Sequence, residues 1–331
     1  MMKTKHYVII LCFLLITLFL FSLTKGSFAL SISDIFHILL GQSTDFMKSQ
    51  VFFNLRFSRV MMAVIAGLAL GIAGAVYQMV FSNPLASPDL TGVATGSSLG
   101  AALAIVLGAG TPYEMMSGAF VVGMLSLGFV LLLVKLTGVH RTMTYLLAGI
   151  VISSVGDAFI MLLKYMADPL GELAAIEFWT MGSLASMTLE KMMMSLIGVM
   201  IPMLLILLCH RQITMLSLGD ENATYLGLNT KTFKIFIFIL TTWMVASVVA
   251  LTGVISFVGL IAPHIAYLLL HKRTGAFFIC SGFIGAILIL VGDLLARCLI
   301  PGGELPLSIL TIFLASPVLV FYMYKQRGKL L

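Results

Sequence analysis

Residues 60–81 read VMMAVIAGLALGIAGAVYQMVF, an apolar stretch without a charged side chain. A helix needs about 20 such residues to cross the hydrocarbon core of a bilayer. Over all 331 residues, hydrophobic residues make up 60% and charged residues only 10%, and the mean hydropathy is +1.13. A soluble domain keeps roughly a quarter of its residues charged to cover its surface. The composition therefore predicts a membrane protein with several spans.

Apolar stretches on both sides of this one predict ten membrane-spanning helices. We expect an all-α integral membrane protein in which residues 1–331 form a single polytopic transmembrane domain. The third and eighth segments are short or interrupted by glycine and proline, so their ends are loosely defined. The ten segments are residues 7–23, 60–81, 93–107, 115–136, 143–166, 192–209, 233–251, 254–270, 276–296 and 307–324.

The first segment also has features of a cleaved signal peptide. Lys3 and Lys5 precede it, and Ser-Phe-Ala at residues 27–29 resembles a cleavage site. Its apolar run is longer than the 7–15 residues usual in a signal peptide. We therefore expect a retained first helix.

The distribution of lysine and arginine predicts that both termini are cytoplasmic. With the N-terminus inside, twelve of the 19 basic residues fall on the cytoplasmic side and seven outside, as the positive-inside rule requires. The net charge of +6 therefore reports orientation and does not indicate a nucleic-acid-binding surface. Arg56, Arg59 and Arg297 fall outside and need another explanation.

Small residues recur at four-residue spacing, at positions 67, 71 and 75 and at positions 92, 96, 100, 104 and 108. Such stripes let helix backbones approach closely in a membrane. Residues 96–100, GSSLG, also match the G-x-S-x-G motif of serine hydrolases, which needs a strand-to-helix turn. No strand precedes them, so helix packing is favoured. An intramembrane serine protease that pairs Ser98 with His264 is an alternative.

The connection between the second and third segments contains two prolines. Asn83, Pro84 and Leu85 open it, within the stretch SNPLASPDLTG at residues 82–92. Irregular backbone at membrane depth is tolerated only where protein or a water-filled cavity satisfies its polar groups. The stretch is either a tight turn or a constriction at the inner end of a transport pathway.

Ionisable residues inside or at the ends of predicted spans are costly and commonly functional. Asp157 and Lys164 are seven residues apart and thus share a helix face, which indicates a pathway lining. They would be the carriers if the protein were an ion-coupled secondary transporter. Asp293 and Arg297 are four residues apart, acid first, which favours an intrahelical ion pair.

A cytoplasmic loop at about residues 210–232 predicts a short helix. Asp220 and Glu221 suit its first turn and Gly227 its end. Ala223 and Leu226 give it a small apolar face. Because so short a helix is marginal alone in water, we expect it to dock on a partner.

The sequence contains no motif for catalysis, nucleotide binding or metal binding. It lacks the G-x-x-x-x-G-K-[ST] phosphate loop, and its four cysteines are isolated from one another. Isolated cysteines in apolar runs are typical packing residues. If ATP drives transport, the ATPase is a separate chain.

Several motifs in order along the chain resemble one transporter family. They are LRFSRV at residues 55–60, NPLA at 83–86, PDL at 88–90 with Gly92, LG at 218–219 and 226–227, GVISFVGLIAPHI at 253–265, DLLAR at 293–297 and ELPL at 304–307. With these motifs the chain resembles the permeases of ABC importers for iron-siderophore complexes, haem and cobalamin, the type II importers of which the vitamin B12 permease is an example.

The resemblance implies a permease with ten helices in a bacterial cytoplasmic membrane and transport by alternating access. It implies a second permease subunit, identical or not, and two cytoplasmic ATPase subunits that bind ATP and Mg²⁺, with no cofactor on this chain. A substrate-binding protein would dock from outside. The motifs do not choose between siderophore, haem and cobalamin.

The resemblance also assigns roles to residues. Acidic residues of the binding protein would contact Arg56, Arg59 and Arg297, and the turn at Asn83, Pro84 and Leu85 would contribute to the cytoplasmic gate. The ATPase would dock on the loop at residues 219–227, which holds Gly219, Asp220, Glu221, Ala223, Leu226 and Gly227.

Overall fold

A computed structural model describes residues 2–26, 28, 30–42, 45–300 and 303–330. The resemblance of residues 27–29 to a cleavage site falls partly outside them. The described residues contain helices and turns and no β-strand. In chain order the elements are α1 Met2–Thr24, α2 Ile32–Leu39, α3 Phe46–Gln50, η1 Val51–Phe57, α4 Ser58–Val80, η2 Pro88–Thr91, α5 Val93–Leu107, α6 Pro112–Thr137, α7 Thr142–Met166, α8 Glu172–Thr180, α9 Leu189–Leu208, α10 His210–Leu216, α11 Asp220–Tyr225, α12 Thr230–Thr252, α13 Val258–Leu270, α14 Gly275–Cys298 and α15 Leu307–Leu330.

Every one of the ten predicted segments falls on a helix, so the prediction of an all-α membrane protein is confirmed. Among the described residues, seven helical stretches are long and apolar enough to cross a membrane, and three shorter apolar helices occupy the remaining predicted positions. The shorter ones are α5, α13 and the first part of α15. The second segment is longer than predicted, because α3, η1 and α4 form one continuous helical stretch from Phe46 to Val80.

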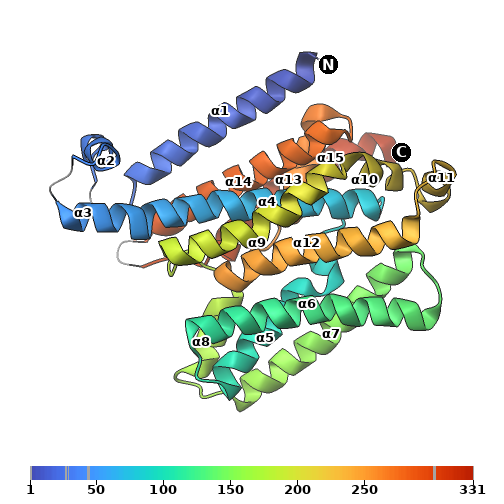
Figure 1. Ribbon diagram of the computed structural model, residues 1–331, viewed down its shortest axis with the longest axis horizontal. Coiled ribbons are helices and arrows are strands. Elements are labelled where there is room, and N and C mark those ends of the chain that lie inside the picture. Colours follow the sequence, from blue (N-terminus) through green and yellow to red (C-terminus); the bar gives the residue numbers. More distant parts are fainter. Residues whose placement is uncertain (1, 27, 29, 43–44, 301–302, 331) are drawn as a thin grey trace.

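Helix α4 is the centre of the bundle. In the most apolar part of the stretch from Phe46 to Val80, 83% of the residues are buried, against 22% for α1 and 28% for α7. Helices α14 and α12 are the next most buried, and both pack on α4. Figure 1 shows α4 in the middle of the molecule, α1 along one side, and α5 to α8 as a separate layer on the other.

The glycine stripes lie where helices touch, as predicted. A Cβ on Gly67 of α4 would lie 2.3 Å from Ala286 Cα of α14, and one on Gly100 of α5 would lie 2.1 Å from the carbonyl oxygen of Gly118 in α6. Nothing larger than glycine fits at either position without moving a backbone. Small residues thus set the distance between α4 and α14 and between α5 and α6.

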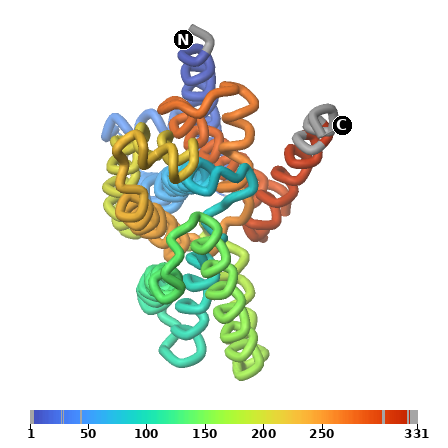
Figure 2. The backbone as a smooth tube through the Cα atoms, turned by 90° about the vertical axis from the view of Figure 1, so that its right-hand side faces the viewer, coloured from blue at the N-terminus to red at the C-terminus, as the bar shows by residue number. Residues whose placement is uncertain are grey.

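The bundle has two distinct ends. Helices α2, α3 and α8 lie at one end, while α10, α11, the start of α1 and the end of α15 lie toward the other (Figure 1). Figure 2 looks along the bundle and shows α15 projecting sideways from it. We call the end with α2 and α8 the outer end and the end with α11 the inner end.

Four short elements at the outer end were missed by the sequence analysis, which left them as loops. They are α2, α3, η1 and α8, and the three α-helices among them have only five to nine residues. Helix α2 begins at a capping box, in which the Ser31 hydroxyl accepts from the backbone N–H of Asp34 and the Asp34 carboxylate accepts from the backbone N–H of Ser31. Helices this short contain no apolar run long enough to cross a membrane, and such runs were the pattern from which helices were predicted.

Candidate functional site at the two ends of the bundle

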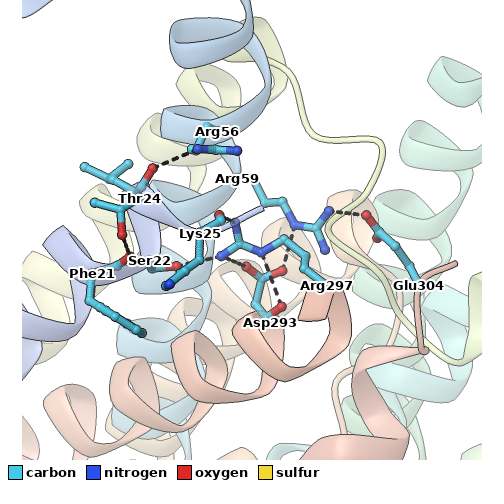
Figure 3. Close-up of polar contacts among 10 residues, drawn as sticks. Phe21, Ser22, Thr24, Lys25, Arg56, Arg59, Asp293, Arg297 and Glu304 are labelled. Carbon is cyan, nitrogen blue, oxygen red and sulfur yellow. Dashed lines mark hydrogen bonds and ion pairs between the residues drawn. The ribbon is translucent and has the colours of Figure 1, made fainter. Parts of the chain in front are cut away.

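The packing of α4 against α14 brings three arginines together at the outer end. Arg56 lies in η1, Arg59 in the first turn of α4, and Arg297 in the last turn of α14. Figure 3 shows Arg59 and Arg297 on either side of Asp293, with Arg56 close by. The predicted docking residues are therefore one cluster, although 241 positions separate Arg56 from Arg297 in the sequence.

Asp293 is a buried carboxylate shared by two of these arginines. Its side chain is only 1% exposed, and Arg59 Nε lies 2.7 Å from one oxygen and Arg297 Nη2 3.0 Å from the other. The predicted pair of Asp293 and Arg297 is thus confirmed, and Arg59 is a partner that helical spacing could not reveal. Arg59 also binds Glu304, with Nη1 2.6 Å from Oε1.

Arg56 differs from the other two arginines in its partners. It donates to the backbone carbonyls of Leu23, at 3.2 Å, and Phe28, at 2.6 Å. Among the described residues it has no carboxylate partner. Its charge is therefore balanced only by carbonyl dipoles, which leaves it able to bind an acid from outside.

The arginines line a cavity of about 890 Å³ that opens at the outer end. Lys25 and Glu304 also line it. Three arginines and Lys25 exceed the two carboxylates, Asp293 and Glu304, so the cavity carries net positive charge. A wall of that kind attracts carboxylates and is most effective where water is excluded.

At the inner end, α11 has the form predicted from the sequence. It begins at Asp220 after Gly219, whose φ of +95° places it among conformations that glycine adopts most easily, and it ends before Gly227. Asp220 and Glu221 occupy its first turn, where carboxylates favour the helix dipole.

The predicted apolar face of α11 is wrong. Ala223 is fully buried in the core of this chain, whereas Leu226 is 57% exposed and Tyr225 89% exposed. A spacing of three residues places two side chains near one another on a helix, but it does not say which way the helix is turned. The large apolar side chains that remain open to a partner here are those of Tyr225 and of Leu226, the residue directly after α11, beside the exposed polar residues of the helix.

Lys234 is a residue at this end that the sequence analysis treated only as one of the cytoplasmic charges. It lies in the second turn of α12 with its side chain 1% exposed. Its ammonium lies 2.6 Å from the carboxylate of Asp220 and 2.8 Å from the hydroxyl oxygen of Thr142. A single lysine thereby links α11, α12 and the first residue of α7.

The connection after α4 is a compact turn. The side-chain oxygen of Asn83 accepts a hydrogen bond from the backbone N–H of Leu85 at 2.9 Å, the pattern of an Asx turn. The Leu85 side chain is 61% exposed, and the Ser82 hydroxyl donates to the carbonyl of Ser217 beside α11. Pro84 and its neighbours therefore lie at the inner end, next to the loop of α11.

Asp157 and Lys164 both lie in α7, in different surroundings. Asp157 is exposed in the isolated chain. Lys164 forms an ion pair with Glu177 of α8, with the charged atoms 2.8 Å apart. Lys164 thus ties α7 to α8, while the Asp157 side chain lies on the surface of the single chain.

The G-x-S-x-G match has no hydrolase geometry. Residues 96–100 lie inside helix α5, and Gly96 and Gly100 serve its packing on α6. His264 Nδ1 donates to the carbonyl oxygen of Leu260, 2.8 Å away, within its own helix. The strained turn that exposes a nucleophilic serine is not formed by Ser98.

A family model described as the FecCD transport family matches residues 14–325. The chain belongs to the FecCD transport family. It is 34% identical to the hemin transport system permease protein of Yersinia pestis, with 96% of each chain covered. It is 31% identical to the molybdate import system permease protein of Haemophilus influenzae, over 96% of this chain and 95% of the relative.

A solved structure has the same fold. It is an inward-facing ABC transporter that is assigned to the metal-chelate type, and its chain is 30% identical, with a TM-score of 0.85 over 97% of this chain and 99% of that one. The FecCD protein described here is thus the permease subunit of an ABC importer, with ATPase and binding-protein partners, and is not itself an enzyme. The alternatives of a serine protease and an ion-coupled secondary transporter are wrong.

Proposed function

We propose that this permease carries a metal chelate, such as an iron-siderophore complex, haem or cobalamin, across a bacterial cytoplasmic membrane. Residues 1–331 would form one transmembrane domain with both termini in the cytoplasm. A second permease subunit, identical or not, would complete the pathway, and two ATPase subunits would bind the ATP and Mg²⁺. No part of this function requires a cofactor on this chain.

The observation that carries the proposal is the pair of different surfaces at opposite ends of one bundle. The outer end offers a cavity with excess arginine, and the inner end offers a short helix with exposed apolar side chains. A permease that receives a substrate on one side and an ATPase on the other needs a docking surface on each. We therefore expect the binding protein to dock at the outer end and the ATPase at the inner end.

At the outer end, the binding protein would insert carboxylates toward Arg56, Arg59 and Arg297. Arg59 and Arg297 already share Asp293, so they would act mainly by their field. Arg56 has the unbalanced charge and would make the new ion pair. Charges at the edge of an interface act chiefly on the association rate and on its dependence on salt.

At the inner end, the ATPase would receive Tyr225 and Leu226. The remaining residues of the coupling loop would hold these two side chains in place: Gly219, Asp220, Glu221, Ala223 and Gly227. Ala223 would do so from within the core, since it is fully buried.

Between the two ends, the turn at Asn83, Pro84 and Leu85 would form part of the cytoplasmic gate. The exposed side chain of Leu85 would meet its counterpart on the second permease subunit. Asp157 and Lys164 on α7 would lie along the pathway, with Lys164 held by Glu177.

Molybdate is a second candidate substrate, because one relative is a molybdate permease and the match to it covers 95% of that protein. The two candidates differ in a property that is simple to measure. The cognate binding protein, purified with its ligand, would be analysed by its absorption spectrum and for bound metals. We expect a visible band with iron or cobalt; a colourless protein that contains molybdenum would replace the metal-chelate proposal by molybdate.

A further inference from the structure

A buried ion pair fastens the short cytoplasmic helix to two long helices. Lys234 of α12 donates to the carboxylate of Asp220 in α11 at 2.6 Å and to the hydroxyl of Thr142 in α7 at 2.8 Å. We call Thr142, Asp220 and Lys234 the cytoplasmic latch. It joins the first residues of α7 and α11 to the second turn of α12, from three separate parts of the sequence.

The two charges of the latch differ in burial. The Lys234 side chain is 1% exposed and the Asp220 side chain 35% exposed. A buried ammonium is costly unless a charged and hydrogen-bonding partner accompanies it. Lys234 is therefore held in one position, and the carboxylate that compensates it must stay with it. Since Asp220 begins α11, a movement of α11 must displace Lys234 or break the pair.

An aromatic cluster lies directly behind the latch. Phe238, one turn after Lys234 on α12, packs against Tyr145 of α7 with ring centroids 5.2 Å apart. It stacks on Tyr77 of α4 and on Phe81, the residue directly after α4, with ring centroids 5.8 and 5.7 Å apart. Close-packed interiors resist compression and transmit displacement. The cluster thus connects the latch to the end of α4, where the turn at residues 83–85 follows.

A second contact ties the same two regions together. The Ser82 hydroxyl, just before that turn, donates to the carbonyl of Ser217, just before α11. The loop of α11 and the proposed gate are therefore joined by a direct hydrogen bond as well as through the latch and the aromatic cluster.

We propose that the cytoplasmic latch transmits the movement of α11 to α7 and α4, with Lys234 as a positioning residue of the transport cycle. The inference rests on the proposed docking of the ATPase on α11. It goes further by stating how that docking reaches the pathway. Helix α11 has two separate attachments: Ala223 holds it to the core, and the latch joins it to α7.

Because the two attachments are separate, a variant can lose the transmission of movement from α11 and still assemble with the ATPase. In a Lys234→Met variant the half-exposed carboxylate of Asp220 can be solvated, so α11 stays in place through Ala223. Of the link to α7, only the long hydrogen bond from the Thr142 hydroxyl to the Asp220 carboxylate, at 3.5 Å, remains. In Asp220→Asn, by contrast, a buried ammonium loses its charged partner, and folding suffers. Lys234→Met is therefore the informative variant, and Thr142→Val removes both hydrogen bonds of the Thr142 hydroxyl, from Lys234 and to Asp220, without changing charge.

The test uses the complete transporter, with permease, ATPase and binding protein, in proteoliposomes. It measures recovery of the ATPase with the permease, stimulation of ATP hydrolysis by the loaded binding protein, and uptake. Lys135→Met, at an exposed position on the same side of the membrane, is the matched control. We expect Lys234→Met to recover the ATPase normally and to lose about tenfold in uptake and stimulation, as for a residue on a coupling route. Thr142→Val should lose part of the uptake and part of the stimulation. Thr142→Ser, which keeps the hydroxyl, should retain both activities.

Two results would overturn the inference. Uptake and stimulation equal to those of Lys135→Met, in both Lys234→Met and Thr142→Val, would make the latch a passive contact. Loss of the ATPase from a stably folded Lys234→Met permease would show that Lys234 only shapes the docking surface. A failure of the proposed docking itself would appear elsewhere, as normal ATPase recovery when Leu226 is replaced by Glu.

Discussion

The two ends of the bundle both hold buried positive charge, and they balance it differently. At the outer end, Arg56, Arg59 and Arg297 face two carboxylates, Asp293 and Glu304, beside a cavity of about 890 Å³. At the inner end, Lys234 meets Asp220 one to one, and its side chain is 1% exposed. The outer cluster thus keeps a spare positive charge next to open space, and the buried pair of the inner end keeps none.

This difference indicates what each end can do. A spare guanidinium beside a cavity can take a carboxylate from another protein without breaking an existing pair. A balanced and enclosed pair gains nothing from a new partner, so its use is to hold elements of the same chain together. Charge of the same sign therefore forms a docking surface at one end and an internal link at the other.

The largest effect should come from removing the shared carboxylate of the outer end. Asp293→Asn leaves Arg59 and Arg297 buried without their common partner, and breaking a buried ion pair costs about 3–5 kcal/mol. We expect a strongly lowered thermal midpoint of the purified permease. Glu304→Gln is the control, because that side chain is 35% exposed and its loss should cost less than about 1 kcal/mol. Equal midpoints for the two variants would contradict the central role of Asp293.

The next effect concerns the inner docking surface. Leu226→Glu places a charge where Leu226 is 57% exposed, so the permease should fold while ATPase recovery falls by about tenfold, the equivalent of 1.4 kcal/mol. Val139→Glu, in another inner loop at 46% exposure, should leave recovery unchanged. Ala223→Arg would instead bury a charge within the chain and lower stability. Normal ATPase recovery with Leu226→Glu would move the docking surface away from α11.

A smaller effect is expected from the spare charge of the outer end. Arg56→Gln should weaken binding of the binding protein several-fold, mainly through a slower association with a reduced salt dependence. Arg56→Lys should keep most of the affinity because it keeps the charge. Lys48→Gln is the control for charge lost at the same end. Association rates that are unchanged in Arg56→Gln at low salt would exclude this arginine from docking.

The smallest effect should come from the exposed pair of Asp34 and Lys48, whose charged atoms are 2.8 Å apart. The ammonium of Lys48 and the hydrogen bonds from Ser31 hold the pKa of Asp34 well below its usual range. A carboxylate with a depressed pKa stabilises the fold above its ordinary pKa of about 3.9 and loses that effect only as the pH falls further. The difference in thermal midpoint between the parent and Asp34→Asn should thus be small and constant from pH 5 to 8. A difference that varied across this range would indicate another titrating group.

Much of the fold could be predicted from the sequence because span length is a local property. Each of the ten apolar segments lies on a helix, and the stripes at Gly67 and Gly100 lie at helix contacts. The short outer helices could not be found in this way. Helix α2 depends on the capping box of Ser31 and Asp34, a signal of four residues within a loop.

The candidate sites were predictable only where one helix contains the whole pattern. Spacing gave the pair of Asp293 and Arg297, which are one turn apart. It could not give the contact of Arg59 with Asp293, which depends on how α4 packs on α14, nor that of Lys234 with Asp220, which depends on the loop that turns back between them. The prediction that Ala223 faces a partner was wrong for a related reason, since the rotation of α11 about its axis is set by tertiary packing.

Uptake by the assembled transporter tests the central claim most directly. Proteoliposomes that contain this permease and its ATPase would receive the loaded binding protein outside and ATP inside, and uptake of its ligand would be followed over time. The account predicts uptake only when the loaded binding protein and ATP are both present. Uptake should fall in Arg56→Gln because the binding protein binds more weakly, and in Lys234→Met because ATP hydrolysis is no longer coupled to transport. Uptake that continues without ATP or without the binding protein would contradict it.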